Sequence, residues 1–191
     1  ISASAPATTS RISWVISVFG KHGGNVRERG VFIADPGHLM MAFDYDQVDA
    51  RAIAAHSQDF TLMDMFEGDT DFHTANAIKL FGDASFREMA KKGGHGTNYG
   101  MRVSGLVKLG VPEDLAREFL KAQAREFPTL CEWREGVRAR AGRGELLDNG
   151  FGRMMRPDPE RAYTQGPALI GQGTTRDIMR TSILALPVDV R

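Results

Sequence analysis

The feature that most constrains this sequence is a repeat of charged and ring-bearing side chains between residues 87 and 100. Every fourth position carries one of them, in the order Arg87, Lys91, His95 and Tyr99. On an α-helix this spacing places the four side chains in one stripe along a single face. Two cations, an imidazole and a phenol make a poor core face. The cations are suited to bind the phosphates of a ligand, and the rings are suited to stack on its base. At 1.5 Å per residue the stripe is ~18 Å long.

The same stretch is crowded with glycines, at positions 93, 94, 96 and 100. Each glycine in a helix interior costs about 1 kcal/mol relative to alanine. A helix that retains them indicates close approach to its backbone, or a need to bend and swing. A solvated helix face remains the alternative interpretation of the stripe. The Gly-Lys-Ser/Thr ending of a Walker loop is absent, so the stretch predicts a nucleotide-binding helix without identifying its kind.

Composition narrows the class of protein. The 191 residues are 42% hydrophobic, enough for one core or two small linked ones. The 24 basic and 24 acidic residues cancel, which argues against a small basic DNA-coating protein but permits a basic cleft. The single cysteine, Cys131, excludes an intramolecular disulfide. No signal peptide opens the chain, and no apolar run approaches the ~20 residues of a membrane span. We therefore expect a soluble, cytoplasmic protein.

Hydrophobic periodicity predicts strands near both ends and helices between them. Residues 11–19 and 39–43 have strand character, and a helix begins after Gln47. Residues 60–82 are predicted as helices broken at 67–69, with Asp71 or Thr74 as a cap and Gly82 as the stop.

The second half of the chain continues this pattern. A helix pair crosses Gly110–Pro112, and its second member is predicted to run to about Gly142. Residues 145–153 predict a hairpin with Asn149-Gly150 at its turn, and a last helix is expected from Thr174 to about 186. The expected class is α+β, an antiparallel sheet domain with a helical insertion.

Three carboxylates lie where the 39–43 strand is expected to end. Asp44 follows the strand directly, and Asp46 and Asp49 lie close to the start of the next helix. Carboxylate oxygens are suitable ligands for Mg²⁺. Helix capping is an alternative role for Asp46, although it does not account for Asp44.

Together these motifs resemble family A DNA polymerases, over residues 8–186. The segment 43–51, FDYDQVDAR, is similar to the first palm motif. In that motif the Asp binds both catalytic metals and the next residue lends a backbone carbonyl, which assigns Asp44 and Tyr45. The resemblance also places Gln47 and Asp49 at the nucleotide and Arg51 at the DNA.

The finger-helix motif of the family is matched by Arg87, Lys91, His95, Tyr99 and Gly100. The resemblance implies that Arg87 and Lys91 hold the triphosphate, with Lys91 also placed to protonate the pyrophosphate leaving group. It implies that Tyr99 stacks at the templating base. Four further residues match other motifs: His73 for the triphosphate, Arg11 for the primer end, Gln172 for the minor groove, and Arg153, with Gly100, for DNA.

The sequence also departs from the family. Asp49 stands where Glu is usual as the gate against a ribose 2′-OH, and His95 replaces a Phe or Tyr. Ala168 stands where Asn is frequent, and no Asn-rich stretch follows the Arg11 segment. The His-Asp-Glu motif that supplies the second catalytic carboxylate does not occur before Arg191. The resemblance therefore implies part of a palm interrupted by helical fingers, with the C-terminal palm and the thumb lying elsewhere in a longer parent chain.

These implications define the expected function. We expect residues 1–55 and 144–191 to form palm and residues 56–143 to form fingers. The activity expected of the parent is two-metal, template-directed DNA synthesis with Mg²⁺, a primer–template and a dNTP, in a bacterial cell or phage-infected host. The rival interpretation is a non-catalytic primer–template or nucleotide-binding fragment. A Mg²⁺ phosphohydrolase is a third, but it leaves the 87–99 stripe without a role.

Overall fold

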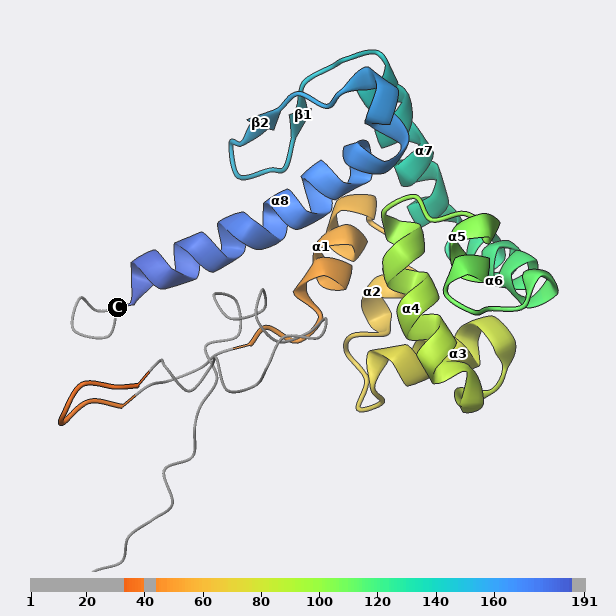
Figure 1. Ribbon diagram of the computed structural model, residues 1–191, viewed down its shortest axis with the longest axis horizontal. Coiled ribbons are helices and arrows are strands. Elements are labelled where there is room, and N and C mark those ends of the chain that lie inside the picture. Colours follow the sequence, from red (N-terminus) through yellow and green to blue (C-terminus); the bar gives the residue numbers. More distant parts are fainter. Residues whose placement is uncertain (1–32, 40–43, 187–191) are drawn as a thin grey trace, which may run out of the picture. The chain divides into compact units, whose positions relative to one another are not determined.

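The computed structural model describes residues 33–39 and 44–186 of the chain (Figure 1). The chain divides into two compact units, Ile1–Asp46 and Gln47–Arg191. Arg11 and the strand expected at 11–19 lie outside the described residues, as does nearly all of the one expected at 39–43. In the first unit, Gly37 has φ +81° and His38 N donates to Asp35 O at 2.9 Å. This confirms the turn that the Pro36-Gly37 pair indicates.

The first half of the second unit is helical, as the sequence predicts. It comprises α1 (Val48–Ser57), α2 (Phe60–Asp64), α3 (Phe72–Phe81), a short 3₁₀ helix (Ala84–Phe86) and α4 (Arg87–Asn98). The expected cap and stop are confirmed at α3. The Asp71 carboxylate accepts from Thr74 N at 3.0 Å, and Gly82 ends the helix with φ +73°.

The long helix expected up to about Gly142 is wrong, because the chain breaks it at Phe127. The segment folds as α5 (Val103–Lys108), α6 (Glu113–Glu126) and α7 (Pro128–Gly142). Phe127 has φ −127° and ψ 60°, outside the helical region. The residue before a proline is disfavoured in the helical conformation, whereas a proline is well suited to the first turn. Pro128 therefore ends α6 and begins α7.

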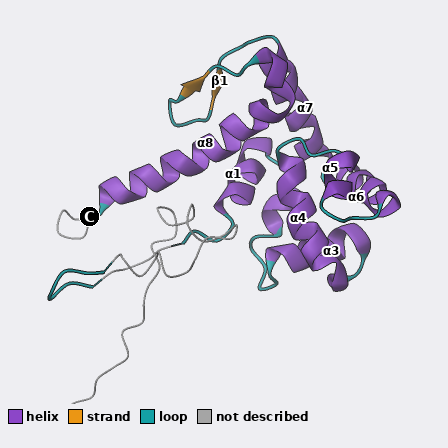
Figure 2. Ribbon diagram, viewed as in Figure 1, coloured by secondary structure: helices purple, strands orange, loops and turns teal. Residues whose placement is uncertain are grey.

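The expected hairpin is confirmed, with a wider connection than a two-residue turn. Strands β1 (Leu147–Asp148) and β2 (Met154–Met155) pair antiparallel, with Leu147 opposite Met155. Gly150 has φ +78°, and its N–H donates to the Asp148 carboxylate at 2.9 Å. The structure is thus mostly helical with a small antiparallel sheet in the part that is described (Figure 2).

The last helix, α8 (Ala162–Ala185), begins well before the expected Thr174 and contains Pro167. A proline inside a helix has no N–H for the carbonyl four residues earlier, here that of Tyr163. Arg138 of α7 donates Nε to that carbonyl at 3.2 Å. A side chain from a neighbouring helix therefore replaces the missing bond, which the local sequence of 162–173 does not reveal.

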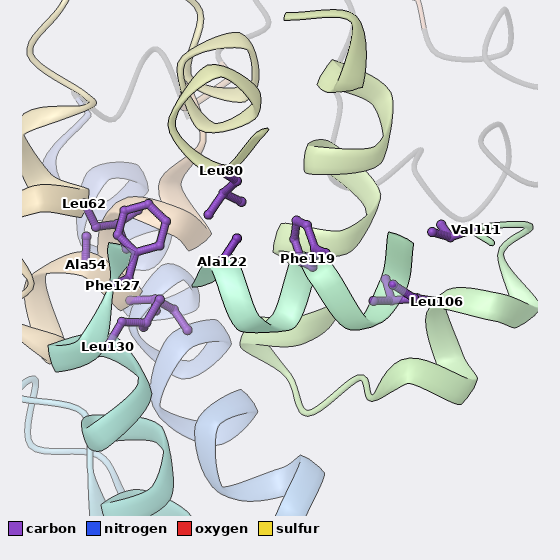
Figure 3. Packing of buried hydrophobic residues seen from close by; sticks show 11 residues of the cluster. Ala54, Leu62, Leu80, Leu106, Val111, Phe119, Ala122, Phe127 and Leu130 are labelled. Carbon is purple, nitrogen blue, oxygen red and sulfur yellow. The ribbon is translucent and has the colours of Figure 1, made fainter. Parts of the chain in front are cut away.

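The main hydrophobic cluster joins α1, α2, α3, α5, α6 and α7. Figure 3 shows Phe127 beside Leu62 and Leu130, with Phe119 further along α6. A smaller cluster around Val137, Leu147 and Ile170 joins α7, the hairpin and α8. Among the described residues no helix is both long and apolar enough to cross a membrane.

Candidate nucleotide and DNA site

The stripe lies on α4 as the spacing predicts, but its four side chains have different surroundings. Lys91 and His95 are exposed and Arg87 is half-buried. Tyr99 follows the last residue of the helix, and its N–H donates to Gly96 O at 3.1 Å. Lys91 forms no ion pair with any described residue. The middle of the stripe therefore presents one cation and one imidazole to solvent.

At the N-terminal end of α4, Arg87 is paired with the carboxylate that caps α3. Its Nε lies 2.9 Å and its Nη2 3.2 Å from the two oxygens of Asp71. The hydrogen bond from Arg87 is the main cause that lowers the pKa of Asp71 to about 2. The residues are 16 positions apart, and sequence reasoning assigned Asp71 only the cap.

His73 lies near the same pair. Its Nδ1 is buried without a hydrogen-bond partner. Burial lowers the pKa of His73, and the positive charges of Arg87 and Lys91 lower it further, against the opposing charge of Asp71. A neutral imidazole beside two cations offers one N–H donor and no added repulsion between cations. Three of the residues predicted to hold a triphosphate are thus close enough to interact electrically.

At the C-terminal end of the stripe, Tyr99 lies between His95 and Asp49. The His95 and Tyr99 rings meet edge to face with centroids 5.1 Å apart. Burial, followed by the negative charge of Asp49, raises the pKa of Tyr99. Asp49 itself accepts a 2.6 Å hydrogen bond from Thr175 Oγ1 of α8. The aromatic end of the stripe is therefore built into the junction of α1, α4 and α8.

Packing explains why three positions of this stretch are glycine. An ideal Cβ at Gly93 would lie 2.9 Å from Cζ of Phe119, and one at Gly96 would lie 2.6 Å from Cε of Met101. Gly100 has φ +91°, and a Cβ there would lie 3.0 Å from the carbonyl oxygen of Tyr163. The close approach predicted for the helix backbone is confirmed, and the atoms that approach belong to the protein itself.

The remaining predicted DNA contacts are spread over α1, the hairpin and α8. Gln172 is exposed on α8, and the Arg51 guanidinium lies 4.7 Å from the centre of the Phe66 ring. Gln47 precedes α1 in a left-handed conformation with φ 52°, and its side-chain oxygen is buried without a partner.

Arg153 has a structural partner that sequence reasoning did not anticipate. Its guanidinium forms two hydrogen bonds to the carboxylate of Asp177, at 2.8 and 2.5 Å. Asn149 Nδ2 donates to the same carboxylate at 2.7 Å. These bonds lower the pKa of Asp177, with the bond from Arg153 as the largest cause. They fasten the hairpin to α8.

Comparison with known proteins identifies the family. Residues 15–190 match the family described as DNA polymerase family A. The chain belongs to this family.

Among curated relatives, DNA polymerase I of Pseudomonas aeruginosa is 31% identical over 179 residues, covering 84% of this chain and 19% of that protein. The thermostable DNA polymerase I of Thermus aquaticus is 30% identical over 179 residues, covering 84% and 21%. The DNA polymerase of Mycobacterium phage D29 is 28% identical over 164 residues, covering 83% and 27%. The chain thus spans about a fifth to a quarter of the length of these relatives.

A solved structure supports the fold. The POL domain of Pol1 from M. smegmatis, described in complex with DNA primer-template and dNTP, superimposes with a TM-score of 0.63 at 21% identity. The match covers 71% of this chain and 27% of that one. The predicted α+β class, a partial polymerase domain, is confirmed by this match and by the family.

Asp44 and Tyr45 are the residues predicted to bind a metal ion. Both residues are exposed, immediately precede the turn that leads into α1, and belong to the first compact unit. A free carboxylate is the hard oxygen donor that a divalent cation prefers. Within residues 33–39 and 44–186, no group of three His, Cys, Asp or Glu side chains is placed to hold a metal ion. The exposed carboxylate of Asp44 is chemically suited to bind a divalent cation, and its role as a metal ligand stays a prediction.

Two buried groups that support α4 and α7 were also missed. Arg134 of α7 is buried and donates to the carbonyl of Thr97 at 2.9 Å, in the last turn of α4. Asp59 is 2% exposed and accepts from Leu62 N and from Leu130 N, both at 3.0 Å. A single carboxylate thereby caps two helices. Local sequence signals a cap at Asp59, but no local signal indicates the contact 71 residues away.

Proposed function

We propose that this chain takes part in template-directed DNA synthesis, as fingers and part of the palm of a longer family A DNA polymerase. One observation carries the proposal: in a chain of this family, α4 presents Lys91 and His95 to solvent on one face, between Arg87 and Tyr99. Residues 1–55 and 144–191 are assigned to palm and residues 56–143 to fingers. We assign the C-terminal palm and the thumb to other parts of a longer parent chain. The parent acts without a membrane, in the cytoplasm of a bacterium or phage-infected host.

The triphosphate is assigned to the N-terminal half of the stripe. Arg87, Lys91 and His73 supply the donors for its β and γ phosphates, and the neutral state favoured for His73 leaves two full positive charges there. Lys91 is assigned the proton transfer to the pyrophosphate leaving group. Phosphoryl transfer depends mainly on positioning and charge neutralisation, which these side chains supply.

Two Mg²⁺ ions are assigned to the complete enzyme, held in part by the Asp44 carboxylate and the Tyr45 carbonyl. When bound, such a pair of ions stabilises the attacking and leaving oxygens. Gln47 and Asp49 line the nucleotide pocket, His95 lies at its sugar and Tyr99 at the templating base.

Primer–template contacts are assigned to Arg11, Arg51, Gly100, Arg153 and Gln172. Exposure of Gln172 on α8 supports its assignment to the minor groove. Asp177 accepts hydrogen bonds from Nε and Nη2 of Arg153, so only the rest of the guanidinium can contact DNA. We expect it to contribute mainly by holding the hairpin.

The test is Lys91→Ala in the full-length polymerase, with Lys92→Ala as the matched control. Both lysines are exposed on α4, and only Lys91 lies in the stripe. Loss of one donor to developing charge costs about 10²–10³ in kcat. We expect that loss for Lys91→Ala with primer–template affinity nearly unchanged, and a small effect for Lys92→Ala. An equal loss of kcat in both variants would reject the stripe as the triphosphate site.

The second candidate is a non-catalytic primer–template or nucleotide-binding fragment. It is favoured for this chain alone because the chain spans about a fifth of relatives such as DNA polymerase I of Pseudomonas aeruginosa. Fluorescence anisotropy with a labelled primer–template, together with a primer-extension assay, separates the two. If both the chain and its full-length parent bind the primer–template but neither extends it, the non-catalytic binding function is favoured.

A further inference from the structure

Thr175 of α8 is the partner of the proposed sugar gate. Its Oγ1 lies 2.6 Å from the Asp49 carboxylate, and 3.2 Å from the carbonyl of Gly171 one turn earlier on the same helix. One hydroxyl proton serves one strong bond at a time. An O–H to carboxylate bond of 2.5–2.7 Å is among the stronger hydrogen bonds in proteins, so the contact to Asp49 dominates.

The bond lies in a crowded junction. Gly171 allows α8 to approach closely, because an ideal Cβ there would lie 2.9 Å from Ile53 and 3.4 Å from the Tyr99 ring. Tyr99 is close enough to Asp49 for the carboxylate to raise the pKa of its phenol. Asp49 thus has Thr175 on one side and Tyr99 on another, and its carboxylate has few ways to rotate.

A short side chain needs such support to form a wall. Aspartate is one methylene shorter than glutamate, so its carboxylate stays nearer the α1 backbone and reaches less far into a pocket. A fixed carboxylate excludes an added hydroxyl by occupying one position, whereas a rotating one leaves space part of the time.

We propose that Thr175 is a positioning residue for sugar selection, because its hydroxyl fixes the Asp49 carboxylate beside Tyr99. Thr175 lies three residues after Gln172, so the same helix turn also carries the proposed minor-groove contact. The position of α8 on the duplex is therefore mechanically linked to the gate. This inference rests on the proposed function, since it concerns selection between dNTP and rNTP.

The experiment measures kcat/KM for dNTP and for rNTP in the full-length polymerase. Thr175→Val removes the hydroxyl at nearly constant volume, and Thr175→Ser keeps the hydroxyl but removes the methyl. Thr164→Val is the control, because Thr164 lies in the first turn of the same helix and, among the described residues, its hydroxyl donates only to the carbonyl of Arg161. An apolar pocket rejects an added hydroxyl by only ~100-fold, so partial release of Asp49 is expected to lower dNTP selectivity by about 3- to 10-fold.

The expected pattern is loss of selectivity in Thr175→Val, retention in Thr175→Ser and no change in Thr164→Val. The double variant Asp49→Ala with Thr175→Val is expected to be no less selective than Asp49→Ala alone, because both act through one carboxylate. If the Thr175→Val variant does not fold, the Thr175→Ala variant takes its place, and its selectivity is compared with that of Thr175→Ser. Unchanged selectivity on loss of the hydroxyl, or equal loss in Thr175→Ser, would overturn the inference. Failure of the unaltered polymerase to incorporate either nucleotide would instead reject the proposed function.

Discussion

Gly93 and Gly136 provide the sharpest test of how the stripe helix is packed. Both lie inside helices, Gly93 in α4 and Gly136 in α7, and neither has a positive φ. Alanine is therefore allowed by the backbone at both positions. On helix propensity alone, each Gly→Ala change should stabilise the fold by up to about 1 kcal/mol.

The two sites differ in what the added methyl group meets. At Gly136 nothing lies within 4 Å of an ideal Cβ, whereas at Gly93 the ring of Phe119 lies at 2.9–3.3 Å. Phe119 is fully buried in α6, so its ring has little room to withdraw. Overpacking a core costs about 1–3 kcal/mol, which equals or exceeds the propensity gain. Gly93→Ala should therefore be about 1–3 kcal/mol less stable than Gly136→Ala.

Urea unfolding followed by circular dichroism at 222 nm measures both variants. Gly136→Ala should unfold at higher urea than the unaltered chain, and Gly93→Ala at the same or lower urea. Phe119→Leu should reduce the penalty of Gly93→Ala, because it removes the ring that the methyl group meets, and the cycle should show a coupling of about 0.5–3 kcal/mol. Equal stabilisation by the two alanines would refute the packing argument.

Three further predictions follow from the site. The purified chain alone should not extend a primer, because Asp44 supplies one ligand where two Mg²⁺ ions need several; measurable dNTP incorporation would contradict this. The Asp71–Arg87 pair should stabilise the fold fully above pH ~3.9, the ordinary pKa of Asp, and this stabilisation should be lost as pH falls through about 2. The Arg87→Met variant should therefore lose less stability than the unaltered chain between these two pH values, as measured by thermal unfolding. Asp49→Ala and His95→Phe should change the dNTP/rNTP ratio non-additively, since both residues contact or face Tyr99; simple additivity would place the gate elsewhere.

Signals that act within a few residues were read correctly from the sequence. The α4 stripe, the Asp71 cap, the Gly82 stop and the Asn149-Gly150 turn all depend on near neighbours. One prediction was wrong although its signal is also local. Hydrophobic periodicity alone extends a single helix through residue 127, whereas Pro128 ends one helix and begins the next.

Contacts between distant segments could not be predicted in this way. The early start of α8 depends on Arg138, which satisfies the carbonyl that Pro167 leaves without a donor. The pairs of Asp71 with Arg87, of Asp49 with Thr175 and of Arg153 with Asp177 join residues 16 to 126 positions apart. The family motifs predict which side chains contact the ligand, but they give no information on which of those side chains have protein partners.

The pairing of Arg87 with Asp71 has a consequence for the proposed triphosphate site. Without a bound anion, Asp71 gives Arg87 a carboxylate in the two-pronged geometry that a phosphate also offers. Both side chains are about two-fifths exposed, so solvent screens the ion pair and its contribution to stability is small. A triphosphate carries several negative charges and would also meet Lys91, which has no competing partner among the described residues. For the proposed triphosphate site we therefore expect phosphate to replace Asp71 as the partner of Arg87, and we expect the carboxylate to orient Arg87 before the anion binds.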